Sequence, residues 1–449
     1  MAEAITHHRV LGIAVPVVLS NVTVPLLGIV DTGVVGQLGE AAPIGAVGLG
    51  AIILSTLYWF FGFLRMGTTG LAGQALGAGD EAEVDAILSR ALLIAAAAGL
   101  FLILLQLPLI GLALSLAPAT AEVEGMARDY LQIRIFSAPA AIAIYGVTGW
   151  LIAQERTRAV LVLQLWMNGL NIALNFWFVL GLGLGVPGVA WATFAAEWAG
   201  LAMALWFCRA VFARAAWRDG ARLWHAERLA KLLQVSRDIT IRSVFLMAAF
   251  TSFLFLGARF GEGTLAANQV LIQFLYVASY GLDGFAFAVE ALVARTLGAG
   301  QRASLRRAVV ICGQWTFGTA LALTLVYAFI GGAVIDLMTT APDVRVLARD
   351  YLPWLVVMPL VAAGSFLIDG VFIGATRTRD MAVMMAWSFA AYVVAVTFFW
   401  PLGNHGLWAA VVVLFLARFA TLLLRYGHVE ASVSPPAEVR GTKKTGFGR

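Results

Sequence analysis

The sequence predicts an all-α polytopic membrane protein with twelve transmembrane helices, arranged as two pseudo-symmetric bundles of six. Composition, span length and an internal repeat lead to this fold class. Of the 449 residues, 61% are hydrophobic and 12% are charged, whereas soluble domains carry about 25% charged residues. Apolar stretches recur along the chain, and many reach the ~20 residues that a spanning helix needs. We expect spans at residues 10–35, 44–70, 88–112, 130–153, 160–183, 187–210, 237–260, 264–294, 308–330, 350–375, 381–401 and 405–428.

The distribution of basic residues predicts the orientation of the chain. With the N-terminus placed inside, about 22 of the 30 Lys and Arg fall in the termini and the even-numbered loops, and about 4 fall in the odd-numbered loops. Because cytoplasmic loops carry the excess of Lys and Arg, we expect both termini to be cytoplasmic. The net charge of +5 then reports topology and does not indicate binding of nucleic acid. No organelle transit segment precedes the first span, so we expect a bacterial inner membrane.

The second half of the chain repeats short strings of the first half at one constant offset. ARDYL occurs at 127–131 and 348–352, LGAG at 76–79 and 297–300, and RTR at 156–158 and 377–379. Six spans per unit give both halves the same orientation, related by an axis along the membrane normal. Such duplication is typical of transporters in which two bundles rock about a site between them.

The repeat divides the chain into an N-lobe with six spans, a basic cytoplasmic linker, a C-lobe with six spans, and a polar tail that we expect to be disordered. These segments cover residues 1–210, 211–236, 237–428 and 429–449.

Asp31 is the strongest candidate for a functional residue in the N-lobe. It lies toward the end of the first span, and a charge within a span costs roughly 2.5–3.5 kcal/mol on insertion scales, so it marks a functional site by default. Pro16 and Pro25 precede it on the same helix. We treat both as hinge residues, because proline removes a backbone hydrogen bond and can kink a helix. The alternative is an interfacial Asp that caps the helix or faces the headgroups.

Polar residues of the fifth and sixth spans are candidates for the same site. Asn171 and Asn175 are four residues apart and share one helix face, and Thr193 lies on the sixth span. Their side chains offer donors and acceptors to a cation, a ligand or Asp31. The alternative is hydrogen bonding between helices that serves packing alone.

The C-lobe also carries charged residues within its spans, namely Arg242, Asp283, Glu290 and Asp369. Asp283 and Glu290 are seven residues apart, which is two turns along one helix face. These groups are candidates for a polar site that binds substrate. Mutual pairing for structure alone is the alternative.

The sequence disfavours enzymatic activity. None of the five His lies in the middle of a span, so we expect no metal or catalytic centre within the membrane and no bound cofactor. A phosphate-binding Gly-rich loop ending in Lys-Ser or Lys-Thr does not occur, which argues against direct drive by ATP. We expect a transporter driven by an ion gradient and not an enzyme.

Several long strings resemble the multidrug and toxic compound extrusion (MATE) family and, within it, the DinF-like branch. They are SNVTVPLLGIVDT at 20–32, LRMGTTGLAGQALGA at 64–78, SRDITIRS at 236–243, GLDGFAFAVEA at 281–291 and DGVFIGATR at 369–377. The resemblance implies two six-helix lobes around a central cleft in a V-shaped arrangement. It also implies antiport of cationic or amphipathic organic compounds against H⁺ or Na⁺.

The resemblance further implies roles for single residues. The coupling acid on the first helix corresponds to Asp31, and the family's proline fifteen positions earlier corresponds to Pro16. The polar positions of the fifth and sixth helices correspond to Asn171, Asn175 and Thr193.

One departure from the family pattern bears on the coupling ion. Close relatives often carry Asp where this chain has Asn175, so the N-lobe site here holds one carboxylate. A single acid suits exchange of one proton, although an Asp with an ordinary pKa of about 3.9 has to be desolvated to hold a proton at neutral pH. Na⁺ bound at Asp31, Asn171, Asn175 and Thr193 is the alternative, since oxygen ligands suit a hard cation. We favour H⁺.

The leading function is therefore a cation-coupled exporter of small organic compounds that lies in the lipid bilayer and acts as a monomer. The alternative is a flippase of a lipid or lipid-linked substrate in the wider superfamily. Such proteins commonly carry extra spans and a strongly cationic cleft, and this sequence predicts neither. The two halves also differ in chemistry, because Asp31 corresponds to Ser252 and Asn175 to Val396 at the offset of the repeat. We therefore expect ion coupling in the N-lobe.

Overall fold

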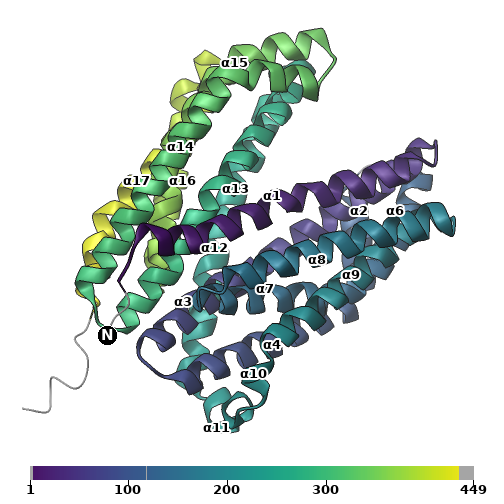
Figure 1. Ribbon diagram of the computed structural model, residues 1–449. Helices are drawn as coiled ribbons and strands as arrows, with labels where there is room; N and C mark the ends of the chain where they lie inside the picture. Colours follow the sequence, from purple (N-terminus) through teal and green to yellow (C-terminus); the bar gives the residue numbers. More distant parts are fainter. Residues whose placement is uncertain (1–3, 118, 434–449) are drawn as a thin grey trace, which may run out of the picture.

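The computed structural model describes residues 4–117 and 119–433, apart from the side chain of Leu26. In this part of the chain all regular structure is helical, and twelve segments are long and apolar enough to cross a membrane. They form two groups of six that diverge from a common end (Figure 1). The predicted fold class is confirmed.

The N-lobe contains the first six spans, of which the second and fourth are built from two α-helices joined by a short 3₁₀ turn. Its elements are α1 His7–Gly36, α2 Ala41–Trp59, η1 Phe60–Gly62, α3 Phe63–Gly77, α4 Glu81–Leu104, α5 Gln106–Ser115, α6 Ala121–Arg134, η2 Ile135–Ser137, α7 Ala138–Ala153, α8 Thr157–Asn175, η3 Phe176–Gly181 and α9 Gly185–Phe207.

The C-lobe contains the other six spans. Its elements are α12 Ala226–Ala258, α13 Glu262–Gly298, α14 Arg302–Met338, α15 Pro342–Gly374, α16 Thr378–Phe399, η5 Trp400–Leu402 and α17 Asn404–Ala431. Helices α13 and α14 extend beyond the predicted spans at both ends, and α15 extends beyond its predicted span at the start. Helical hydrogen bonding continues there past the apolar stretch. Helix α17 likewise reaches into the segment expected to be a tail, and residues 434–449 of that segment lie outside the described residues.

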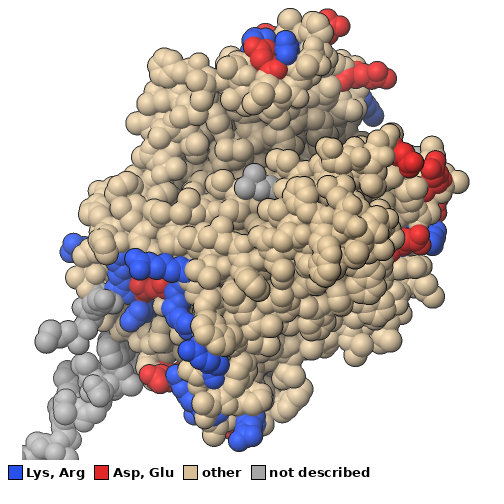
Figure 2. All heavy atoms as spheres, turned by 45° about the vertical axis from the view of Figure 1, so that its right-hand side comes forward, with Lys and Arg blue, Asp and Glu red and all other residues tan. Residues whose placement is uncertain are grey.

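The charged residues lie at the two ends of the molecule. Figure 2 shows Lys, Arg, Asp and Glu gathered at opposite ends of the face in view, with a broad uncharged band between them. Large apolar side chains are exposed in the spans, among them Phe329 at 83% and Leu424 at 85%. An exposed apolar band between charged ends is what a bilayer requires. The chain is a multi-pass membrane protein.

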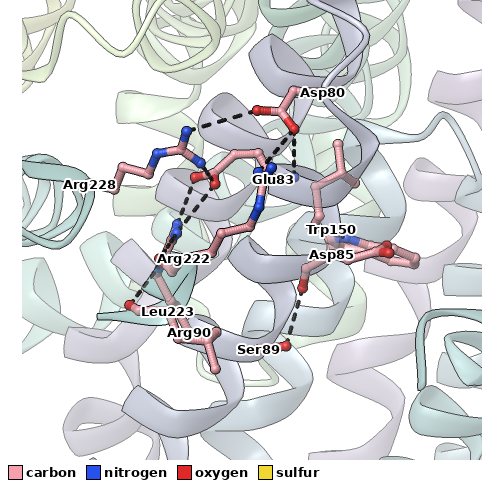
Figure 3. A network of polar contacts seen from close by, with 10 residues as sticks. Asp80, Glu83, Asp85, Ser89, Arg90, Trp150, Arg222, Leu223 and Arg228 are labelled. Carbon is pink, nitrogen blue, oxygen red and sulfur yellow. Dashed lines mark hydrogen bonds and ion pairs between the residues drawn. The ribbon is translucent and has the colours of Figure 1, made fainter. Parts of the chain in front are cut away.

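The segment between the lobes is partly helical and is bound to the N-lobe. It contains α10 Arg209–Phe212, η4 Ala215–Arg218 and α11 Gly220–Leu223, and α12 already begins within the predicted linker. Figure 3 shows how α4 holds it: Arg90 donates to the carbonyl of Arg222 at 2.7 Å and to Glu83 at 2.8 Å, and Arg228 pairs with Glu83. These ion pairs allow polar turns of α11 and α12 to fold against the N-lobe.

The two lobes meet closely where α3 of the N-lobe packs against α13 and α15. Glycines permit this approach, because a Cβ atom on Gly77 would collide with the carbonyl of Arg295, and one on Gly298 with the carbonyl of Gln74. Gln74 also donates from Nε2 to the carbonyl oxygen of Gly374 at 2.9 Å. The lobes are therefore in backbone contact at the end of the molecule that carries the N-terminus (Figure 1).

Helix α1 belongs to the packing of both lobes. Near its start, Val10 and Ile13 are buried in a hydrophobic cluster with residues of α13, α14 and α15. At its end, Val34 and Val35 are buried in the core of the N-lobe with α2, α6 and α7. Both prolines of the helix lie between these two anchored ends. A change in the angle between the lobes therefore acts on the segment of α1 that contains the prolines.

Candidate functional site

Asp31 lies at the end of a chain of hydrogen bonds that crosses three helices. Nδ2 of Asn175 on α8 donates to Oδ1 of Asp31 on α1 at 2.6 Å and to Oδ1 of Asn171 at 2.9 Å. Nδ2 of Asn171 donates to Oγ1 of Thr193 on α9 at 2.8 Å. The structure thus brings together all four residues that the sequence singled out for the N-lobe site. We call them the Asp31 cluster.

The Asp31 cluster is buried and rich in oxygen atoms. Asp31 is 8% exposed, whereas Asn175 is fully buried. Among the described residues, Oδ1 of Asn175 has no hydrogen-bond partner and Asp31 has no ion pair within 4.0 Å. The described residues also contain no group of three or more His, Cys, Asp and Glu side chains placed to hold a metal ion. One carboxylate and an unused amide oxygen therefore face a site that lacks a balancing positive charge.

The local structure of α1 and α8 places these side chains. The hydroxyl of Ser20 donates to the carbonyl of Pro16 at 2.8 Å, one turn below, and Nδ2 of Asn168 on α8 donates to the carbonyl of Thr23 at 3.1 Å. Directly after Asn175, α8 continues as the π-helical segment η3. Such segments occur mostly as single turns within α-helices and frequently at functional sites. The polar face of α8 is thus bonded to α1 on both sides of Pro25.

An ion pair beside the Asp31 cluster was not predicted from the sequence. Arg134 at the end of α6 makes two hydrogen bonds to Glu197 of α9, of 2.6 and 3.0 Å, and also donates to Ser137 at 2.7 Å. Both charges are close enough to act on the Asp31 carboxylate. The available signal was an Arg within the fourth span and a Glu within the sixth. Because Glu197 is bound to Arg134, Asp31 is left without an ion pair among the described residues.

In the C-lobe, Asp369 of α15 binds two arginines at once. Nη2 of Arg242 on α12 and the guanidinium of Arg418 on α17 both contact the Asp369 carboxylate, with Nε of Arg418 at 3.1 Å from Oδ1. All three side chains are buried. Arg418 is a third partner that the sequence did not assign to the candidate site. We call this group the Asp369 cluster.

The remaining two C-lobe candidates both lie on α13. Glu290 is buried and forms an ion pair of 3.3 Å with Arg65 of α3, so this pair joins the two lobes. The guanidinium of Arg65 also lies 3.8 Å from the ring centre of Phe287. Asp283 is partly exposed, lies near Arg65, Arg242 and Arg418, and has no ion pair within 4.0 Å among the described residues. The C-lobe candidates thus separate into two paired acids and one unpaired acid.

Comparison with known protein families accounts for the duplicated architecture. The MatE family profile matches residues 16–177 and, a second time, residues 239–400. One match falls in each lobe. The chain belongs to the MatE family. The prediction of this family is confirmed, and with it the prediction of a transporter in place of an enzyme.

This MatE protein resembles relatives along almost its whole length. It is 38% identical over 419 residues to DNA damage-inducible protein F of Escherichia coli. The alignment covers 91% of this chain and 90% of the relative. It is 25% identical over 442 residues to multidrug resistance protein PmpM of Pseudomonas aeruginosa, covering 90% and 88%. The predicted DinF-like branch is confirmed by the first of these.

The fold is also found among solved structures. A MOP superfamily transporter from Pyrococcus furiosus superposes with a TM-score of 0.85 at 17% identity, covering 95% of this chain and 97% of that one. At this identity the likeness establishes the fold alone. The V-shaped arrangement of two six-helix lobes is therefore shared with a transporter of distant sequence.

Proposed function

We propose that this MatE protein is a cation-coupled antiporter that exports organic cations and amphipathic compounds by alternating access, with Asp31 as the coupling carboxylate. The geometry of the Asp31 cluster carries this proposal. A buried carboxylate in a membrane span is held by an amide, with no cationic nitrogen within 4.0 Å among the described residues. The printed name of the relative PmpM, a multidrug resistance protein, supports the substrate class.

The charge balance of the site sets the stoichiometry that we propose. Arg134 and Glu197 compensate one another, so the Asp31 cluster carries one uncompensated negative charge when Asp31 is ionised. Moving an isolated charge into a low-dielectric environment is unfavourable. One monovalent cation therefore neutralises the site, and a bound organic cation competes for the same charge. We therefore propose that one coupling ion enters for each positive charge on the exported substrate.

We favour H⁺ over Na⁺ as the coupling ion. A protonated Asp31 is neutral and needs only one acceptor, and Oδ1 of Asn175 in the same cluster is a buried acceptor without a partner. Na⁺ would have to share the oxygens of Asp31, Asn171, Asn175 and Thr193, and three of these residues already accept a hydrogen bond from within the cluster. A proton needs less rearrangement.

We propose that α1 couples ion binding at Asp31 to the change in the angle between the lobes. Asp31 lies on the C-terminal side of Pro16 and Pro25, and the helix is anchored in the C-lobe at its start and in the N-lobe at its end. A change in the hydrogen bond between Asp31 and Asn175 therefore acts on a helix that both lobes hold. The paired C-lobe acids, Asp369 and Glu290, are proposed to maintain structure, because each already has a cationic partner.

The closed end of the V is proposed to face the cytoplasm. The N-terminus and the end of α17 lie there (Figure 1), and the basic residues of the linker and of the turn before α16 lie at the same end. Cytoplasmic ends of membrane proteins carry the excess of Lys and Arg. In this orientation the structure is open to the outside, and export requires the contact between the lobes to open. A bacterial inner membrane and a monomeric state complete the proposal.

Transport measurements in proteoliposomes test this function directly. With a fluorescent organic cation, we expect exchange when a proton gradient is imposed alone and little exchange when a Na⁺ gradient is imposed alone. The reverse result would assign Na⁺. Absence of exchange under both gradients, together with movement of labelled lipid between leaflets, would replace the antiporter proposal by a flippase.

Alternating access predicts that joining the lobes at their closed end stops transport. Glu155, in the turn before α8, accepts from Arg9 at 2.7 Å and from Arg295 of α13 at 2.9 Å, and so links the lobes. We expect a Glu155→Cys and Arg295→Cys double variant to lose transport when a short bifunctional thiosulfonate forms a disulfide with each thiol and so links the two sites. Transport should return once a reductant cleaves these disulfides. The native Cys208 and Cys312 are both buried and are replaced by Ala.

The matched control for the linking experiment is either single-cysteine variant treated with the same reagent. It should retain transport, because one thiol cannot tie the lobes together. Undiminished transport by the fully linked double variant would exclude opening of the lobes at this end.

A further inference from the structure

A basic pocket of about 650 Å³ opens beside the turn that precedes α16, away from the Asp31 cluster and from the contact between the lobes. Its walls come from α12, from the turn between α15 and α16, from the first turns of α16, and from α17. Four basic side chains and one acid line it, so the lining has a net charge of four minus one, or +3: Lys231, Arg377, Arg379, Arg425 and Asp380.

Three of these cations have no anionic partner in the part of the chain that the structure describes. Asp380 pairs with Arg377 at 2.8 Å. Lys231, Arg379 and Arg425 are exposed and have no carboxylate within 4.0 Å among the described residues. They extend from three different helices toward one pocket. Like charges brought together in this way repel each other unless an anion joins them.

The start of α16 adds to the positive potential. The helix begins at Thr378, and the side chain of Arg377 at its N-cap position accepts no hydrogen bond from the backbone amides of the first turn. The hydroxyl of Thr378 is used elsewhere, because it donates to Asp238 of α12 at 3.2 Å. The first amides of a helix carry partial positive charge and bind anions, phosphate groups in particular. Residues 376–380 line the pocket, so this helix end lies at its wall.

The internal repeat shows that the fold does not require the charges of Lys231 and Arg425. At the offset of the repeat, the turn with Arg377 and Arg379 corresponds to Arg156 and Arg158 in the N-lobe. Lys231 and Arg425, however, correspond to Val10 and Ala204, which are both fully buried. The N-lobe therefore has the same turn but no basic residues at the positions that correspond to Lys231 and Arg425. Basic residues that serve only to orient the protein in the membrane could occupy any exposed position at this end of the molecule.

The face of α16 that continues from the pocket is apolar. Arg379, Val383 and Trp387 follow each other at intervals of four residues and so share one helix face. Val383 is 44% exposed and Trp387 is 64% exposed. A cationic group is thus followed by an exposed apolar track along a membrane span. This is the arrangement that fits a charged headgroup with its acyl chain, and a free anion would not use the track.

We propose that this pocket binds a phosphate group, supplied by the headgroup of an anionic membrane lipid. Basic pockets between transmembrane helices bind anionic headgroups in this way. The phosphate oxygens supply the anionic partner that Lys231, Arg379 and Arg425 do not find among the described residues, and the acyl chains lie along Val383 and Trp387. The site is separate from the one proposed for ion coupling and does not depend on the transported substrate.

Native mass spectrometry of the full-length protein in detergent tests the proposal with dioleoylphosphatidylglycerol, and with dioleoylphosphatidylcholine as the zwitterionic control. We expect the protein to retain phosphatidylglycerol preferentially. The triple variant Lys231→Gln, Arg379→Gln, Arg425→Gln should bind it about tenfold more weakly or worse. Single variants provide the matched comparison: Arg379→Gln should weaken binding severalfold, and its N-lobe counterpart Arg158→Gln should not.

A parallel arm with inorganic phosphate, read by thermal unfolding, distinguishes the source of the anion. Stabilisation of the original protein by phosphate but not by phosphatidylglycerol, and its loss in the triple variant, would overturn the lipid assignment in favour of a soluble phosphate compound. Equal retention of phosphatidylglycerol by the original protein and the triple variant would overturn the site. The same conclusion would follow if Arg158→Gln weakened binding as much as Arg379→Gln.

Discussion

Replacing Asp31 by Asn is expected to abolish gradient-driven efflux, with a loss of at least about tenfold. The amide is nearly the same size as the carboxylate, and the neutral side chain can stay buried beside Asn175. It cannot bind and release a proton, and it offers no charge to Na⁺ or to an organic cation. The measurement is transport of a fluorescent cation in proteoliposomes under an imposed gradient, together with the amount of protein inserted.

The control for this variant is Asp350→Asn. The side chain of Asp350 is 60% exposed and lies beside His405, and it belongs to neither the Asp31 cluster nor the Asp369 cluster. We expect normal transport from it. Thermal unfolding of the two variants should be close to that of the original protein, since neither substitution removes a buried cation's partner. Full efflux by Asp31→Asn would remove Asp31 from the coupling mechanism.

Replacing Asp369 by Asn is expected to reduce the free energy of unfolding by about 3–5 kcal/mol, since removing one partner of a buried ion pair leaves an uncompensated charge. Here two charges are left, because Arg242 and Arg418 both bind this carboxylate. The measurement is thermal unfolding in detergent. Adding Arg418→Met to Asp369→Asn should recover part of the lost free energy of unfolding, because one of the two unpaired buried charges is then removed.

The matched control is Glu124→Gln, which breaks an ion pair of 3.0 Å with Arg128 in which both side chains are 42% exposed. Exposed pairs contribute about 0–1 kcal/mol, so this variant should unfold close to the original protein. If Asp369→Asn unfolded at the same temperature as Glu124→Gln, the Asp369 cluster would have no role in stability.

The helices and their grouping could be predicted from the sequence because membrane spans are a local property. Apolar length is read from neighbouring residues, and the constant offset of the internal repeat fixes six spans per lobe. The ends of the helices were less predictable. Helix α12 begins at Ala226, within the predicted linker, because Arg228 pairs there with Glu83 of α4. That contact joins positions far apart in the sequence, and hydropathy does not report it.

The candidate site divides in the same way. Spacing along α8 placed Asn171 and Asn175 on one face, and burial cost singled out Asp31 within a span. Which partner each acid takes was not readable, since Glu197 also lies on a neighbouring helix. The structure gives Glu197 to Arg134 and leaves Asp31 to Asn175. The rotation of each helix about its axis decides this, and that rotation follows from packing over the whole bundle.

By itself, the sequence determined that the chain crosses the membrane twelve times in two similar halves, because apolar length, charge bias and repetition are written in consecutive residues. Only the tertiary structure decided which charges compensate one another. Arg65 and Glu290 lie in different halves of the chain and meet across the lobes, and Arg418 joins Arg242 at Asp369. It also gathered Lys231, Arg379 and Arg425 around one pocket. Electrostatic interactions depend on distance in space, which a linear sequence does not contain until its helices are packed.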